Sequence, residues 1–210
     1  MDARLRLRAF LLVAFVLIVG AYVSPLADWG EHRSFAAHMA QHLLIGDLAP
    51  IAIVLARPDR VPRVVLAIAL PAWLGNLAVW HVPTVYEAAL HHGFVHELQH
   101  VALWVAGILL WVAILTSALS LGVRLAIVGG MMLGGLALSS VFLWWPRVLY
   151  STYAHAGGFA GMSPLTDQRV GGGLMLLEGM LVGLCAAGWL IYQLVRDDIT
   201  NAPEGVSPSP

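Results

Sequence analysis

The sequence predicts an all-α polytopic membrane bundle of about six transmembrane helices, with both termini in the cytoplasm. Of the 210 residues, 60% are hydrophobic and 11% are charged, and the mean hydropathy is +0.81. A soluble domain of this size cannot bury so much apolar surface in one core. The chain also contains apolar runs that are long enough to cross the hydrocarbon layer of a bilayer.

The apolar runs follow one another along the whole chain. The first, over residues 9–26, follows three arginines, and we interpret it as an uncleaved signal anchor because its end offers a poor cleavage site. The third run is short and the last is long. The later runs cover residues 34–56, 64–80, 94–115, 125–145 and 170–195.

The connections between the runs have their own character. Residues 81–93 are typical of a short interfacial helix, and residues 146–169 form a loop rich in Gly and Tyr. The end of the chain, residues 197–210, is rich in Pro, Ser and Asp and is predicted to be a disordered cytoplasmic tail. We therefore expect one transmembrane helical domain, residues 1–196, followed by this tail.

Arginine placement predicts the orientation, because positively charged flanks stay on the cytoplasmic side. With the N-terminus inside, only Arg33, Arg147 and Arg169 fall outside. The inner set is larger: Arg4, Arg6, Arg8, Arg57, Arg60, Arg63, Arg124 and Arg196. The arginines form no continuous stripe, so we do not expect a nucleic acid partner. A single cysteine, Cys185, excludes an internal disulfide and a Cys-based metal cluster.

All nine histidines fall at or near the predicted outer side. Two pairs, His38 with His42 and His96 with His100, are spaced i,i+4, which places each pair on one helix face. Both helices run inward from the outer side, so the two pairs lie at matching depth. His81 ends the third run at the same level and is our candidate for an exchanging ligand. We therefore predict a metal site made of these five residues.

Simpler interpretations exist for single histidines. Isolated histidines near a membrane surface are often interfacial residues, and we assign this role to His32, His91, His92 and His155. A proton relay is a weaker alternative, because the histidines form no path to the inner side.

Several metals suit the predicted ligands, because neutral imidazole binds zinc, copper, iron and nickel. Met39, Met162 and Met175 are expected at the same level, and thioethers favour Cu(I), although packing explains any one methionine. These residues give copper a slight preference and otherwise leave the metal open. Haem ranks lower, because two histidines at i,i+4 on one helix cannot occupy trans positions on one iron.

An enzymatic alternative comes from the sequence HELQH. It matches the H-E-x-x-H motif, in which His96 and His100 would hold zinc while Glu97 activates water. An intramembrane zinc metalloprotease would need a third ligand, and Asp167 or Glu178 are candidates. This interpretation leaves His38, His42 and His81 without a role, so the protease is the minority interpretation.

Three further polar residues lie inside the predicted spans. Asp47 is about 140° around an α-helix from His42, so we do not expect it to bind the same ion. It could cap a helix break or pair with an inner arginine. Glu178 shares a helix face with Met175, and a proton-linked role and a structural hydrogen bond are equally compatible with it. Asn76 is assigned to packing.

Four blocks of the sequence resemble the CtaG family, the membrane assembly factors associated with caa-type cytochrome c oxidase. They are HMAQHLLIGDLAP from His38, WHVPTVYEAAL from Trp80, HELQH from His96 and SPLTDQRVGGGLM from Ser163. The resemblance implies a non-enzymatic protein of the bacterial plasma membrane that helps to mature a haem-copper oxidase at the stage of copper insertion. An oxidase subunit and the lipid bilayer are then the expected partners, and self-association into a homo-oligomer stays open.

The resemblance also implies that certain positions belong to the family's recurring motifs. Together with the spacing argument, it leads to a copper site near the outer face, with four further residues in a second layer around the ligands. The expected ligands are His38, His42, His81, His96 and His100, and the second layer is Met175, Asp167, Glu178 and Glu97.

Overall fold

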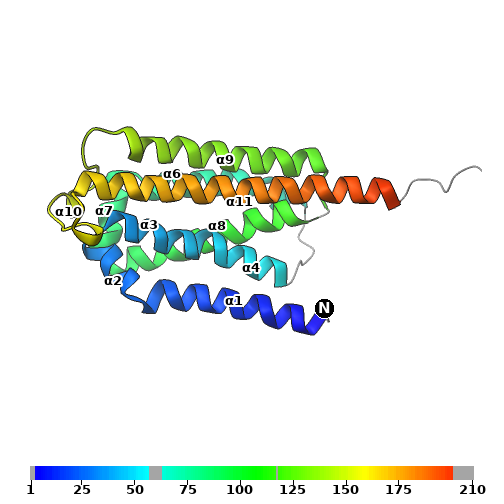
Figure 1. The fold of residues 1–210 in the computed structure, drawn as a ribbon, viewed down its shortest axis with the longest axis horizontal. Helices are drawn as coiled ribbons and strands as arrows, with labels where there is room; N and C mark the ends of the chain where they lie inside the picture. Colours follow the sequence, from blue (N-terminus) through cyan, green and yellow to red (C-terminus); the bar gives the residue numbers. More distant parts are fainter. Residues whose placement is uncertain (1–2, 57–62, 117, 201–210) are drawn as a thin grey trace, which may run out of the picture.

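The computed structural model confirms the all-α fold. It describes residues 3–56, 63–116 and 118–200, and these contain helices, turns and loops but no strand. The long helices run side by side along one direction (Figure 1). The start of the chain and the end of the last helix lie at the same end of the bundle. Three short helices, α2 (Pro25–His32), α7 (Pro83–His91) and α10 (Ser151–Ala154), lie at the other end, which we call the loop end. Which of these ends faces the cytoplasm stays a prediction from the arginines.

Five helical segments are long and apolar enough to cross a membrane. They match five of the six predicted runs, although the last helix starts earlier than expected. The segments are α1 (Ala3–Val23), the continuous series α3 (Phe35–Leu43), η1 (Leu44–Leu48) and α4 (Ala49–Ala56), then α8 (Gly93–Leu115), α9 (Leu121–Trp144) and α11 (Pro164–Thr200).

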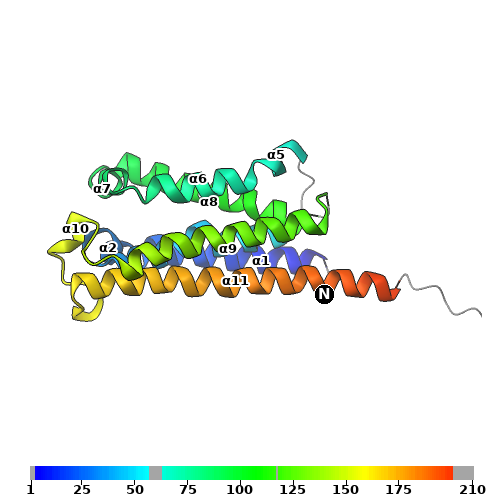
Figure 2. The same ribbon diagram turned by 90° about the horizontal axis from the view of Figure 1, so that it is seen from above.

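The predicted short run at 64–80 is divided into α5 (Arg63–Ala67) and α6 (Ala69–Trp80). Pro71 explains the break, because it has no amide hydrogen to bond the carbonyl of Ala67 one turn earlier. At 1.5 Å per residue, the 12 residues of α6 span only about 18 Å, too short to cross a bilayer alone. Figure 2 shows α6 alongside α8. Two short helices, α5 and α6, therefore stand where the third run had predicted one membrane-spanning helix.

Four short helices form the loop end of the bundle. The predicted interfacial helix is present as α7 (Pro83–His91), and α2 (Pro25–His32) was not predicted. The other two are α10 (Ser151–Ala154) and the 3-10 helix η2 (Phe159–Gly161). The predicted tail begins inside α11, which continues to Thr200, and the remainder of that tail lies outside the described residues.

Close helix contacts determine which faces meet. A Cβ at Gly107 of α8 would collide with the carbonyl oxygen of Gly46 in η1, so glycine allows these two backbones to touch. Gly30 allows a similar close contact between α2 and α3, because a Cβ there would lie 2.9 Å from the Cα of His38. These contacts bring α2, α3 and α8 together at the loop end, where the predicted histidine pairs lie.

Candidate metal centre

Two helices bring four of the predicted ligands together. Four imidazoles form a group that we call the histidine ring. They belong to His38 and His42 of α3 and to His96 and His100 of α8. The ring centroids lie 4.1 Å apart in the α3 pair and 4.2 Å apart in the α8 pair. Across the helices, the distances are 5.7 Å for His38–His96 and 5.5 Å for His42–His100. The two predicted pairs are therefore adjacent in space.

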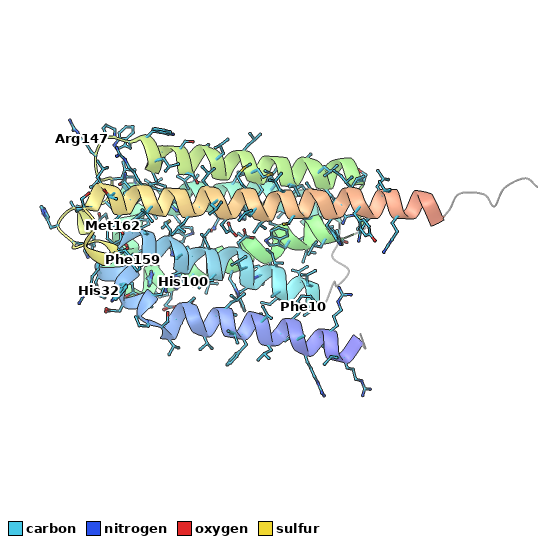
Figure 3. All side chains as sticks on the ribbon, viewed as in Figure 1. Phe10, His32, His100, Arg147, Phe159 and Met162 are labelled. Atoms are coloured by element: carbon cyan, nitrogen blue, oxygen red, sulfur yellow. The ribbon has the colours of Figure 1, made fainter. Side chains whose placement is uncertain are left out.

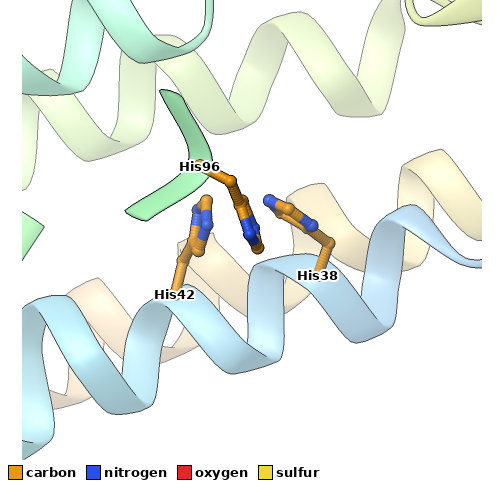
Figure 4. Close-up of side chains that lie close together, drawn as sticks. All are labelled: His38, His42 and His96. Atoms are coloured by element: carbon orange, nitrogen blue, oxygen red, sulfur yellow. The ribbon is translucent and has the colours of Figure 1, made fainter. Parts of the chain in front are cut away.

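The histidine ring has the donor atoms that a metal ion needs. Figure 4 shows His38, His42 and His96 with their side chains gathered between α3 and α8, and one nitrogen from each lies within 4.8 Å of the others. All four imidazoles are buried, with at most 7% of any residue exposed. Both ring nitrogens of His42 and His100 make no hydrogen bond with the described residues. Buried polar atoms normally have partners, and a metal ion would supply them here.

Glu31, which the sequence interpretation missed, lies at the edge of the histidine ring. Its Oε1 lies 3.6 Å from Nδ1 of His96, and the Nε2 of His96 is buried without a hydrogen-bond partner among the described residues. A carboxylate on one imidazole nitrogen orients the other nitrogen toward a metal. No pattern in the sequence pointed to this residue, because it lies on α2, which was not predicted.

Two glutamines occupy equivalent positions beside the histidine pairs. Gln41 and Gln99 are 0% and 1% exposed, and each is the fourth residue of an H-x-x-Q-H sequence. Nε2 of Gln41 donates to the carbonyl of Ala21 at 3.2 Å, which ties α3 to α1. The amide atoms of Gln99 make no hydrogen bond within the described part of the chain. The repeated H-x-x-Q-H spacing was the sequence signal that could have identified them.

Asp167 lies at the start of α3 and not among the imidazoles. The Ser34 hydroxyl donates to Oδ1 of Asp167 at 2.7 Å and accepts a hydrogen bond from the Ala37 amide at 3.0 Å. The Ala36 amide also points to Oδ2 of Asp167, at 3.4 Å. A carboxylate at a helix N-terminus is favourable because the free amides there carry partial positive charge. Asp167 therefore holds the first turn of α3 in place, just before His38.

His81 lies apart from the histidine ring, at the end of α6. Its Nδ1 donates to the carbonyl of Leu77 at 2.7 Å, since a carbonyl can only accept. Burial lowers the pKa of His81 to about 4, although this hydrogen bond acts in the opposite direction. The imidazole is therefore neutral at neutral pH, and its Nε2 is buried without a partner among the described residues.

Three tyrosines cover the loop end of the site. Tyr86 stacks on Tyr150 with ring centroids 3.8 Å apart, and its ring lies 5.2 Å from that of His38. The Tyr153 hydroxyl donates to the carbonyl of Gly30 at 2.6 Å, and the Tyr150 hydroxyl donates to the carbonyl of His81 at 3.0 Å. Burial raises the pKa of each phenol, so all three stay neutral. This aromatic layer separates the histidine ring from the loops.

A cavity of about 80 Å³ lies next to the histidine ring, on the side away from the loop end. It is lined by His42 of the ring and by six residues that the sequence analysis had singled out, among others. These six are Met39, Asp47, Asn76, His81, Met175 and Glu178. Met175 and Glu178, both predicted to lie in the second layer around the ligands, therefore line this cavity together with His42.

The angle around the helix axis between His42 and Asp47 is smaller than the one that an α-helix predicts. Asp47 lies in η1, a π-helix that begins two residues after His42 and turns the chain by less per residue than an α-helix does. Both consequently line the same cavity. The carboxylate of Asp47 accepts a hydrogen bond from Nε1 of Trp111 and is in hydrogen-bond contact with Glu178. These contacts take the place of the predicted arginine partner.

The zinc-protease arrangement fits the structure less well. Glu97 can reach within 4.8 Å of His96 and His100, but its side chain is exposed on the outside of the bundle. Neither predicted third ligand belongs to this group, because Asp167 binds the start of α3 and Glu178 binds Asp47. The imidazoles of α8 face those of α3 instead.

The remaining candidates lie away from the site. His32, His91, His92 and His155 are exposed at the loop end, and Figure 3 labels His32 there. His32 and His91 approach Asp28 and Glu87, at 3.5 and 3.4 Å. Met162, which Figure 3 labels in the loop before α11, does not line the cavity. Asn76 does line the cavity, and it accepts a hydrogen bond from Trp80 at 2.9 Å, as expected for a packing role.

Comparison with known proteins gives one match. The family model described as cytochrome c oxidase caa3 assembly factor matches residues 2–197. This range includes the histidine ring, the cavity and the helices of the loop end. No curated protein and no solved structure matches the chain.

Proposed function

The chain belongs to the cytochrome c oxidase caa3 assembly factor family, and from this premise we propose that it binds copper at the histidine ring and aids its insertion into a haem-copper oxidase. The observation that carries the proposal is the set of buried imidazole nitrogens without hydrogen-bond partners, contributed by two adjacent helices. On this proposal the protein delivers a metal to the oxidase and is not an enzyme. We place the protein in the bacterial plasma membrane, with the ring toward the outer face.

The choice of copper follows from charge and ligand type. The ring consists of neutral imidazoles inside a bundle of apolar helices, where the cost of holding an ion rises with its charge. Monovalent Cu(I) is therefore held at lower cost than a divalent ion. Two thioethers, those of Met39 and Met175, are buried next to the ring and favour the same soft ion.

The location of the ring suits transfer. His38 is in the first turn of α3 and His96 is in the first turn of α8, so the ring is one or two turns from the loop end. Three aromatic side chains and the short helices separate it from the surroundings there, and an oxidase subunit could displace them. Exchange of ligands between two proteins requires this kind of shallow site.

The test is a metal analysis with a Cu(I) titration of the purified full-length protein against a competing chelator. We expect bound Cu(I) in the wild type and its loss from the ring in the double variant His38→Ala with His96→Ala. The double variant His91→Ala with His155→Ala is the matched control, because both of these histidines are exposed at the loop end. In cells, the first variant should leave the oxidase deficient in copper while the second supports its assembly.

Other outcomes would reject the copper proposal. Bound zinc, together with proteolysis that Glu97→Gln abolishes, would favour the metalloprotease. A Soret absorption band that disappears in the double ring variant would favour a haem-binding protein. A wild-type protein that binds no metal would reject all three.

A further inference from the structure

The cavity beside the histidine ring has a separate set of donor groups. Its volume of about 80 Å³ is enough for a metal ion, and a few polar groups stand in a lining that is otherwise apolar. Elements η1, α3, α6, α8, α9 and α11 each contribute to its lining. Neither the family description nor the motif H-E-x-x-H refers to it.

Two imidazoles offer lone pairs to the cavity. His42 is 7% exposed, and both of its ring nitrogens lack a hydrogen-bond partner among the described residues. The Nδ1 of His81 is occupied by the Leu77 carbonyl, so Nε2 is the nitrogen left without a proton. Unpartnered imidazole nitrogens are rare in a buried environment. Their presence on one cavity indicates a ligand that accepts electron pairs.

Two thioethers line the same cavity from different helices. Met39 of α3 is 1% exposed and Met175 of α11 is 8% exposed, and these two helices pack against each other. Packing alone explains a buried methionine. Two methionines with two unpartnered imidazoles, however, form a donor set that is typical of Cu(I).

A pair of carboxyl groups lies in the deeper part of the cavity. Asp47 and Glu178 are in hydrogen-bond contact with each other, which requires at least one of the two groups to carry a proton. With one shared proton, the pair carries a single negative charge. The indole of Trp111 donates to Asp47, while Oε1 of Glu178 is buried without a partner among the described residues.

We propose that this cavity is a second Cu(I) site, held by His42, His81, Met39 and Met175 and balanced in charge by the Asp47–Glu178 pair. The proposal rests on the proposed function, because it concerns the same cargo. His42 belongs to both sites, so it can remain a ligand while the ion moves between the ring and the cavity. An ion in the cavity and the singly charged carboxyl pair sum to zero charge, which lowers the cost of burying both.

The experiment is an anaerobic Cu(I) titration of the full-length protein in detergent, followed by X-ray absorption spectroscopy. The wild type should bind two equivalents, and the spectrum should contain a sulfur scatterer. The double variant Met39→Leu with Met175→Leu should lose one equivalent and the sulfur signal, while keeping the other. Met180→Leu is the matched control, because Met180 is also on α11 but is exposed and does not line the cavity. Leucine preserves apolar volume, and an unchanged elution profile shows that the variant is folded.

A reciprocal variant separates the two sites. Replacing His38 and His96 by Ala removes ring ligands but none of the cavity residues, so one equivalent with its sulfur signal should remain. The double variant Asp47→Asn with Glu178→Gln should weaken this remaining equivalent by about tenfold or more, because it removes the balancing charge. Glu97→Gln is the control, since that carboxylate is exposed.

The outcomes distinguish the two proposals. A wild type that binds one equivalent, lost in the ring variant and indifferent to the methionine variant, overturns the second site and leaves the proposed function intact. A methionine variant that keeps both equivalents also overturns it. A wild type without copper overturns the proposed function and the second site together.

Discussion

The histidine ring and the cavity share His42 but are built in opposite ways. The ring collects four residues of one type from two helices, each supplying an i,i+4 pair. The cavity collects imidazoles, thioethers and carboxyl groups from different elements, including the π-helix η1 and the end of α6. The first arrangement contains only imidazoles, and the second also contains two carboxyl groups. A site made of residues that repeat at helical spacing can be recognised in a sequence. A site made of residues from several separate elements cannot.

The largest expected effect comes from the residue that the ring and cavity share. His42→Gln should remove both copper equivalents, whereas His96→Gln should remove only the ring equivalent, because His96 does not line the cavity. Glutamine preserves much of the side-chain volume and limits the structural change. The measurement is copper stoichiometry by titration. Equal losses in the two variants would contradict the distinction between the ring and the cavity.

The next effect concerns the start of α3, on which the ring and cavity both depend. Asp167→Ala should lower the free energy of unfolding by about 2–3 kcal/mol, because it leaves the Ser34 hydroxyl and nearby amides without a buried acceptor. Asp167→Asn, which keeps one acceptor, should cost less. Thermal unfolding followed by tryptophan fluorescence measures both. An Asp167→Ala protein as stable as the wild type would show that α3 does not need this contact.

A smaller effect should distinguish the ring from the cavity. Glu31→Gln should weaken copper binding at the ring by about 10- to 100-fold, as is usual when a carboxylate that orients a histidine ligand is lost. The cavity equivalent should not change, because Glu31 contacts His96 and not His42. Competitive titration with chelators of graded affinity can resolve the two equivalents. Asp28→Asn on the same helix is the control, since Asp28 lies beside the exposed His32.

The last variant is expected to change neither copper binding nor stability. Glu97→Gln should leave both copper equivalents and the stability unchanged, because the side chain is exposed and belongs to neither site. The measurements are the same titration and unfolding experiments. A loss of bound metal or of a cellular activity in this variant would restore the H-E-x-x-H interpretation.

Much of the fold could be predicted because membrane insertion depends on local composition. Five long helices correspond to runs of apolar residues, which need only sufficient length to cross the hydrocarbon layer. The prediction was less accurate for residues 64–80, where Pro71 divides one run into α5 and α6. Helix α2 was missed because it is short and has a charged surface, and so it produces no hydropathy signal.

The candidate site could be predicted only in its repeated part. By itself, the sequence determined the two i,i+4 pairs and the family resemblance, since both follow from residue type and local spacing. Only the tertiary structure decided that η1, which continues α3, packs against α8 through the contact that Gly107 and Gly46 allow. It also decided that Glu31 lies beside His96 and that η1 turns Asp47 toward the cavity. The physical reason is that side-chain spacing along a helix is set by covalent geometry, whereas contacts between helices depend on how closely their backbones can approach.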